Sequence, residues 1–271
     1  MLRSDTRAAL SEPLSAFRPQ AARASNSGVD ETRAFWRRVE RYAPGVQVVA
    51  TPVVAVALVV SGWGCEARVL PDGRRQIFSI LLPGDAVFRP AEASLSSVAV
   101  VAVTRLEISQ CADSAIDAGT GLIDALMRQC ARLQDHVVRL GSLNAHERTV
   151  HLLLELHERL GMIGLVKDDT YRIPLTQEAF AEALGLSVVH INRTLGHLRK
   201  LGLITLRSGT VALHDIARLN ALASFFPKAP ASHHAQKALV GAVADSCTAK
   251  RAPVADGSAS RTCQLRIENP A

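Results

Sequence analysis

The segment GLSVVHINRTLGHLRKLGLI, residues 185–204, combines side chains that can contact DNA bases with the spacing of an amphipathic helix. Ile191, Leu195 and Leu198 recur at intervals of four and three residues and would form one apolar face. The rest of the segment carries two histidines and three basic side chains but no acidic residue. Arg can pair with guanine O6 and N7, Asn with adenine, and an aliphatic side chain can contact a thymine methyl group. The segment therefore predicts a helix that reads base edges in the major groove.

The residues before this helix predict a helix-turn-helix. Thr176 can cap a first helix over residues 177–184, because its side-chain oxygen can accept a hydrogen bond from the first turn. Gly185 then supplies a tight turn, and Ser187 can cap a second helix that runs to about Lys200. Two short capped helices joined by a turn that contains glycine are typical of DNA-binding units.

The sequence LITLRSGTVAL, residues 203–213, follows as a strand, a turn and a second strand. Each piece alone also fits an ordinary helical hairpin or surface loop, but their order and close spacing favour a winged helix, with Arg207 over phosphates. The candidate DNA-contacting residues are Thr176, Gln177, Ser187, Val188, Val189, His190, Asn192, Arg193, His197 and Arg207.

Composition is compatible with a DNA-binding protein but does not prove one. The chain has 271 residues, enough for one large or two ordinary domains, and a formal net charge of +6. A basic balance favours acidic partners, although this argument concerns solubility as much as recognition. Aromatic residues make up 4%, so Val, Leu, Ile and Ala must build the core. The five cysteines are scattered without a CxxC pair, which indicates neither a zinc knuckle nor a disulfide framework.

Residues 43–65 carry no charge and are long enough to cross a bilayer. Prolines and glycines interrupt this stretch, and its interior VVAVALVV is dominated by β-branched valine. We therefore expect buried strands and not a membrane span. The N-terminal sequence lacks the apolar region of a secretory signal, so we expect a cytoplasmic protein.

The first half of the chain predicts a β domain. We expect a flexible arm over residues 1–32 and a short helix over 33–42, with its aromatic residues and Val39 facing inward. Short β-type runs broken by turn residues then extend from residue 46 to 109. Pro71-Asp72-Gly73 predicts a hairpin and Pro83-Gly84-Asp85 a second turn, since Pro presets φ and Gly supplies positive φ. Many short strands at this spacing are typical of a sandwich or barrel.

A long amphipathic helix is expected to follow, over residues 112–140. Its apolar residues occupy a and d positions over almost three heptads, which favours the seam of a parallel dimer. One helix packed on its own domain would show the same pattern. The candidate dimerisation residues are Ile123, Leu126, Cys130, Leu133, Val137 and Leu140.

Residues 144–161 predict another helix, with an apolar stripe formed by Val150, Leu153, Leu154, Leu156 and Leu160. Three histidines in this segment lie five and six residues apart, which is not the i, i+4 spacing of zinc ligands on a helix. We therefore expect solvated histidines and no metal site.

Two stretches together resemble the Crp/Fnr family of bacterial transcription regulators. They are GWGCEARVLPDGRRQIFSILLPGD in the β region and LTQEAFAEALGLSVVHINRTLGHLRKLGLI in the helix-turn-helix region. The resemblance extends from about residue 35 to 223 and implies an α+β fold with an N-terminal double-stranded β-helix sensor, resembling a jelly roll. The expected parts are a flexible arm 1–32, a sensor 33–111, a dimerisation helix 112–141, a winged helix-turn-helix 142–226 and a disordered tail 227–271.

The same resemblance implies a homodimer that binds a palindromic DNA site, with half-sites roughly 34 Å apart, and that contacts RNA polymerase. Many family members carry a Glu where Val189 stands, so we expect a different half-site from the common one. Arg193 matches the family's base-reading arginine, and Asn192 and His190 are additional candidates.

No effector is indicated. The cyclic-nucleotide members that this pattern resembles carry Gly-Glu and Arg-Ser pairs, whereas this chain has Asp85-Ala86 after Gly84 and Ser96-Ser97. Without a buried Arg to pair with a phosphate, cyclic AMP is not expected. No cysteine precedes Cys65, so an N-terminal iron–sulfur cluster is not expected either. A haem stays open, because one His or Cys is enough to hold it.

Other functions fit the sequence less well. An enzyme built on the β region would need a metal set or a nucleophile with a base, and residues 46–109 contain no histidine. A winged helix that binds a protein partner stays open, as does a regulator without effector that is controlled by its own abundance. We predict a DNA-binding transcription regulator and not an enzyme.

Overall fold

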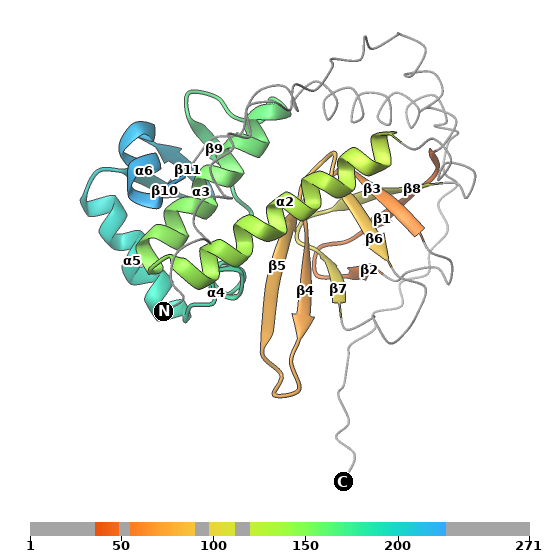
Figure 1. The fold of residues 1–271 in the computed structure, drawn as a ribbon, viewed down its shortest axis with the longest axis horizontal. Coiled ribbons are helices and arrows are strands. Elements are labelled where there is room, and N and C mark those ends of the chain that lie inside the picture. Colours follow the sequence, from red (N-terminus) through yellow and green to blue (C-terminus); the bar gives the residue numbers. More distant parts are fainter. Residues whose placement is uncertain (1–35, 49–54, 90–97, 112–119, 226–271) are drawn as a thin grey trace, which may run out of the picture.

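The computed structural model describes residues 36–48, 55–89, 98–111 and 120–225. A β domain and a smaller helical domain lie side by side, and a long helix crosses in front of both (Figure 1). The predicted arm and tail, and the first residues of the predicted dimerisation helix, lie outside the described residues.

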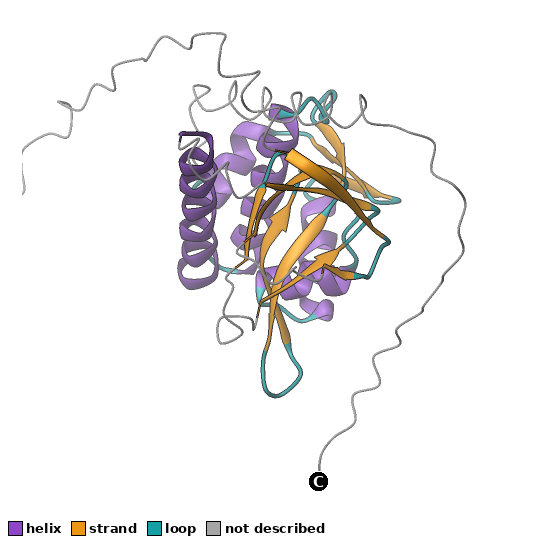
Figure 2. Ribbon diagram, turned by 90° about the vertical axis from the view of Figure 1, so that its right-hand side faces the viewer, coloured by secondary structure: helices purple, strands orange, loops and turns teal. Residues whose placement is uncertain are grey.

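The β domain is built from two four-stranded antiparallel sheets, in the orders β1-β8-β3-β6 and β2-β7-β4-β5. In side view one long helix stands at the left of the strands, and the other helices lie behind them (Figure 2). This arrangement confirms the predicted β fold. The strands are β1 Trp36–Tyr42, β2 Gln47–Val48, β3 Ala55–Ser61, β4 Gly64–Val69, β5 Arg75–Leu81, β6 Ala86–Arg89, β7 Val98–Ala102 and β8 Leu106–Cys111.

The prediction of a helix over residues 33–42 was wrong, because Trp36–Tyr42 forms strand β1. This strand pairs antiparallel with β8, and its register shifts between Trp36 and Arg38. Such a bulge breaks the two-residue alternation of a strand. In the sequence, Trp36, Val39 and Tyr42 are three residues apart, a spacing that a helix would also give, although the backbone is extended.

The two turns predicted in the β domain are present. Gly73 adopts a φ of 82° between β4 and β5, and Gly84 a φ of 91° between β5 and β6. At the second turn the Leu82 amide donates to Asp85 Oδ2 at 2.7 Å. This bond holds the Asp85 carboxylate at the end of β5, on the side where the helices pack.

Two helices connect the domains. Helix α2 spans Thr120–Ser142 and helix α3 spans Ala145–Met162. Asn144 begins α3 with a capping box, in which its side chain accepts from the first-turn amides and Glu147 accepts from the Asn144 amide. The predicted apolar stripe of α3 is buried throughout.

Helix α3 is the common core of the molecule. Its leucines belong to one hydrophobic cluster that also contains Trp63, Ile77 and Ile80 of the β domain and Ile191 and Leu195 of the helical domain. The expectation that all its histidines are solvated was wrong, because one of them, His151, is buried. In the described part of the chain, no helix is long and apolar enough to cross a membrane.

The helical domain has the predicted winged-helix order. Strands β10 and β11 form the predicted hairpin, and a third strand extends the sheet in the order β10-β11-β9. The third strand and the last helix, α6, were not predicted. The elements are β9 Thr170–Arg172, α4 Gln177–Leu184, α5 Val188–Lys200, β10 Ile204–Arg207, β11 Thr210–Leu213 and α6 Ile216–Ala223.

Candidate nucleic-acid interface

The turn between α4 and α5 is held by local capping contacts. Thr176 caps α4 by accepting from the Ala179 amide, and Ser187 caps α5 by accepting from the His190 amide. Gly185 ends α4 in the left-handed conformation, with a φ of 62°. These contacts set the start of α5 relative to α4, as the sequence predicted.

Helix α5 has one buried face and one exposed face. Ile191, Leu195 and Leu198 are buried as predicted, and Thr194 lies with them. Val189 is 69% exposed, so its apolar side chain belongs to the outer face of the helix. The exposed residues of α5 are Val189, His190, Asn192, Arg193, His197, Arg199 and Lys200. No acidic side chain interrupts this face, so it presents donors and positive charge together.

One hydrogen bond links the exposed face of α5 to the start of α4. Asn192 Nδ2 donates to Gln177 Oε1 at 2.8 Å. Because the Asn192 amide group is oriented by this bond, its carbonyl oxygen stays available to a ligand. Both residues were predicted as site residues, and the structure brings them together.

The other predicted contact residues of the helix-turn-helix differ in exposure and in role. Thr176 and Ser187 use their hydroxyl groups as caps, while Val188 is only partly exposed. His197 is exposed, and its ring meets that of His146 edge-on at 5.0 Å between centroids.

The wing carries two basic residues, of which sequence analysis found one. Arg207 is exposed beside a two-residue turn, Ser208-Gly209, in which both φ values are positive. Thr210 on β11 pairs with Arg207 on one side and with Arg172 of β9 on the other. Arg172 is also exposed. Its three-residue strand is too short to show a periodic pattern, so no sequence signal placed it here.

Helix α2 exposes an apolar stripe, which we define as Leu126, Met127, Cys130, Val137 and Val138. The long helix at the left of Figure 2 has its outer side uncovered by other described elements. Three predicted seam residues, Leu126, Cys130 and Val137, belong to this stripe. Leu133 and Leu140 are partly buried within the protomer, and the side chain of Ile123 lies outside the described residues.

The β domain offers little reactive chemistry. Burial raises the pKa of the Cys65 thiol to about 11, so it stays protonated and unreactive. Among the described residues, no group of three or more His, Cys, Asp or Glu side chains is placed to hold a metal ion. Asp85, which sequence analysis compared with a nucleotide-binding pair, makes an ion pair with Arg159 at 2.6 Å.

A winged helix joined through long helices to a β domain is the architecture of a DNA-binding regulator, and comparisons with known proteins agree. The family model for the Crp-like helix-turn-helix domain matches residues 147–222. The nitrogen fixation regulation protein FixK of Bradyrhizobium diazoefficiens is 32% identical over 164 residues, which cover 58% of this chain and 69% of FixK. FixK of Azorhizobium caulinodans is 31% identical over 177 residues, which cover 62% of this chain and 71% of that protein.

Solved structures show the same fold. FixK2 from Bradyrhizobium japonicum aligns with a TM-score of 0.58 at 24% identity, covering 68% of this chain and 96% of FixK2. A CRP-family transcriptional regulator from Thermus thermophilus aligns with a TM-score of 0.55 at 22% identity, covering 70% of this chain and 98% of that regulator. The chain belongs to the Crp/Fnr family of DNA-binding transcription regulators. This membership confirms the predicted regulator and gives no support to an enzyme.

Proposed function

We propose that this regulator binds a palindromic DNA site as a homodimer, with α5 of each protomer in a major groove. The observation that carries this proposal is the exposed, acid-free face of α5. Arg193, Asn192 and His190 supply groups that hydrogen-bond to base edges, and Val189 supplies an apolar contact for a thymine methyl group. Solubility alone does not call for a 69% exposed valine beside these side chains.

Contacts to the DNA backbone come from the surroundings of α5. Arg207 on the wing and the residues at the start of α4 and α5 lie where phosphates pass beside an inserted helix. Helix N-termini attract phosphate through their first-turn amides. The caps at Thr176 and Ser187 each occupy only one of these amides. The proposed contact set keeps Gln177, Val188 and His197 at the edges of the same surface.

The α2 stripe supports the homodimer. Five exposed side chains with apolar or thiol groups along one helix are costly to leave in water, and a second copy of α2 would cover them. The proposed seam contains Leu126, Cys130 and Val137, with Ile123, Leu133 and Leu140 along its length. Such a dimer places two recognition helices about one helical turn of DNA apart.

We propose no named effector for the β domain. Its inner cluster is filled by buried aliphatic side chains, including Val59, Leu81 and Leu106. This packing supports either a small apolar ligand bound after rearrangement or control by protein abundance. We also propose that the DNA-bound protein contacts RNA polymerase, because the family consists of transcription regulators.

Selection of duplexes from a random library tests the function. Purified protein is incubated with the library at about 0.15 M salt, since affinity for DNA falls steeply with salt. We expect enrichment of a palindrome whose half-sites are about 10 base pairs apart. Enrichment of single half-sites, or none with and without cell extract, would contradict the dimeric proposal. An affinity that hardly changes with salt would favour a protein partner instead.

A further inference from the structure

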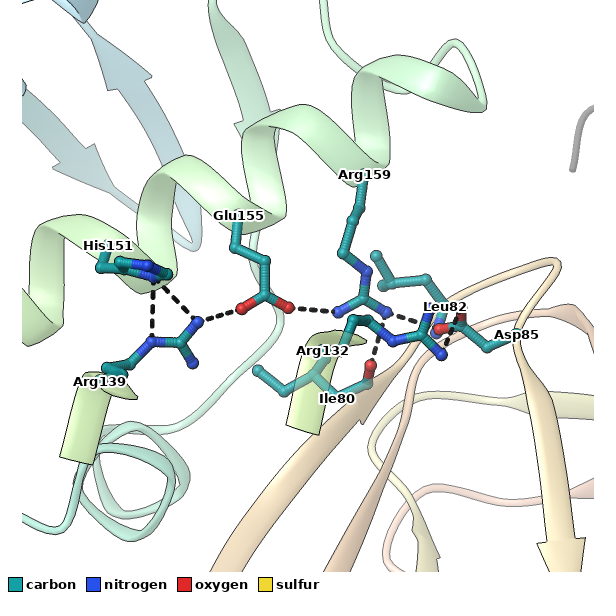
Figure 3. Close-up of polar contacts among 8 residues, drawn as sticks. All are labelled: Ile80, Leu82, Asp85, Arg132, Arg139, His151, Glu155 and Arg159. Atoms are coloured by element: carbon teal, nitrogen blue, oxygen red, sulfur yellow. Dashed lines mark hydrogen bonds and ion pairs between the residues drawn. The ribbon is translucent and has the colours of Figure 1, made fainter. Parts of the chain in front are cut away.

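A chain of buried polar contacts crosses the junction between the β domain and the helical domain (Figure 3). Arg159 Nη2 pairs with Asp85 Oδ2 at 2.6 Å, and Arg159 Nη1 pairs with Glu155 Oε1 at 2.9 Å. Arg139 contacts the other oxygen of Glu155, and its Nη2 lies 3.1 Å from Nδ1 of His151. The sequence gives no hint of this chain, because its members are up to 74 residues apart.

The members come from three elements that meet at this point. Asp85 belongs to the turn that ends β5, while Arg159, Glu155 and His151 lie four residues apart along α3. Arg139 comes from α2. The chain therefore starts in the β domain and continues along the core helix of the helical domain.

The charged members of this chain are largely buried. Asp85 is 2% exposed and Arg159 8% exposed. Burial alone would raise the pKa of Glu155, but Arg139 and Arg159 lower it to about 2. Burial and the neighbouring Arg139 lower the pKa of His151, which leaves it neutral. The carboxylates of Asp85 and Glu155 thus contact three guanidinium groups, those of Arg132, Arg139 and Arg159.

The Arg159 guanidinium group also bonds to the backbone of the β domain. Its Nη2 also donates to the Ile80 carbonyl oxygen at 2.7 Å, so one planar group holds a side chain and a backbone atom of the β domain. On the α2 side the contact is weaker, since Arg132 Nη2 lies 3.4 Å from Asp85 Oδ1. Arg132 Nε has no hydrogen-bond partner among the described residues. Asp85 is therefore tied to α3 more tightly than to α2.

A second ion pair joins the two domains, and it is more exposed. Arg75 of β5 pairs with Glu182 of α4 at 2.7 Å, with side chains 37% and 25% exposed. Exposed pairs contribute little, whereas a buried pair that loses one partner leaves an uncompensated charge. Buried pairs add little net stability, and in some proteins they select one arrangement over its alternatives.

From these contacts we infer that Asp85 and Arg159 are positioning residues for DNA binding, which fix the angle between the winged helix and the β domain. In the proposed homodimer this angle sets the distance between the two recognition helices. The inference rests on the proposed function, because only a dimer has two recognition helices to space. Its measurable consequence is discrimination between DNA sites that differ in half-site spacing.

The test compares three duplexes: a single half-site, the selected palindrome, and the palindrome with one base pair inserted at its centre. The variant D85N/R159M removes both charges while an amide oxygen at 85 can still accept from the Leu82 amide. The control is E107Q, which breaks the surface pair between Arg41 and Glu107 inside the β domain, 2.9 Å apart. Thermal unfolding checks that each variant is folded.

We expect D85N/R159M to bind the half-site within about twofold of wild type while its preference for the selected spacing falls about tenfold or more, equivalent to about 1.4 kcal/mol. E107Q should keep the wild-type preference. A general loss of stability would weaken all three duplexes together, so it would not change this ratio. A folded D85N/R159M that keeps the wild-type ratio would overturn the inference.

Two further outcomes also decide the matter. If the double variant does not fold, the same ratio is measured for D85N, and a wild-type ratio there overturns the inference. If wild-type protein shows no spacing preference, the proposed dimeric function fails, and the inference fails with it. The wild-type measurement thus tests the function, and the variant measurement tests the positioning role.

Discussion

Arg193 projects from the exposed face of α5, where a guanidinium group can donate two hydrogen bonds to one guanine. We predict that Arg193→Ala weakens binding to the selected palindrome by about 1–3 kcal/mol and relaxes specificity at one base pair of each half-site. Fluorescence anisotropy on matched and scrambled duplexes measures both effects. Equal losses on the two duplexes would show that Arg193 contacts only phosphate.

Lys200→Ala is the control for Arg193→Ala, because it also removes one positive charge, at the end of the same helix. We expect Lys200→Ala to weaken all duplexes alike and to reduce the salt slope by about 1, as for the loss of one phosphate contact. A sequence-dependent loss at Lys200 would contradict a phosphate contact at this position.

Glu66 is buried on β4, where Gln129 of α2 donates to it at 3.3 Å. Burial raises its pKa to about 7, although hydrogen bonds and Arg132 oppose this shift. A carboxyl whose pKa is raised by folding stabilises the fold at low pH, and this contribution is lost as the pH rises through about 7. Glu66→Gln should therefore stabilise the protein more at pH 8 than at pH 5. The effects of the substitution on the free energy of unfolding should differ between the two pH values by up to about 3 kcal/mol.

Urea unfolding of wild type and Glu66→Gln at both pH values makes this measurement. If the substitution changes stability by the same amount at pH 5 and pH 8, Glu66 does not titrate between them. The polar groups that face Glu66 are Ser79, Gln129, Arg132 and Asp85, and all of them are kept in the variant.

The exposed residues of α5 could be predicted from sequence, and buried polar partners could not. Because a helix has a fixed period, the residues of α5 that do not belong to its apolar face must lie on its exposed face. His151 and Asp85 instead depend on Arg139 and Arg159, which approach them only in the folded chain. No local pattern encodes such a pairing.

At the scale of elements, the turn between α4 and α5 depends on Gly185, whose φ is 62°. We predict that Gly185→Ala destabilises the protein by about 1–2 kcal/mol, because a Cβ is unfavourable in the left-handed conformation. Gly196→Ala is the control, since Gly196 lies inside α5 and only the end of Arg199 approaches within 4 Å. That substitution should stabilise by up to about 1 kcal/mol. Denaturant midpoints compare the two, and similar shifts would contradict this reasoning.

The α2 stripe leads to a prediction on assembly. Val137→Asp should convert the proposed dimer to a monomer, because it would place a charge on each side of the proposed apolar seam. Val69→Asp is the matched control, since Val69 is also exposed but lies on β4. Sedimentation velocity separates the outcomes. A Val137→Asp protein that stays dimeric would exclude this face of α2 as the seam.

Elements with strong local signals were predicted well. Capping residues and a glycine turn mark both helices of the helix-turn-helix, and their bounds match the prediction. Strand β1 was assigned as a helix because Trp36 and Val39 lie three residues apart and do not alternate. Strand β9 and helix α6 were missed because they are short and depend on packing against the wing and α3.

At the scale of the whole molecule, the two domains share one hydrophobic cluster and the buried contacts around Arg159. Periodicity in the sequence predicts each element but not how the elements meet, so the contact between the two domains could not be predicted. The shared core means that the angle between the domains is a property of the packed molecule. The DNA-binding surface depends on this angle only if two copies act together.

The most direct test of the dimeric account is to insert five base pairs between the half-sites of the selected palindrome. About half a helical turn is added, which rotates one half-site to the opposite side of the duplex. Two recognition helices held in one rigid dimer then cannot both reach their sites. We predict that affinity falls to that of a single half-site. Unchanged affinity for the lengthened site would contradict the account, because the protomers would be binding independently.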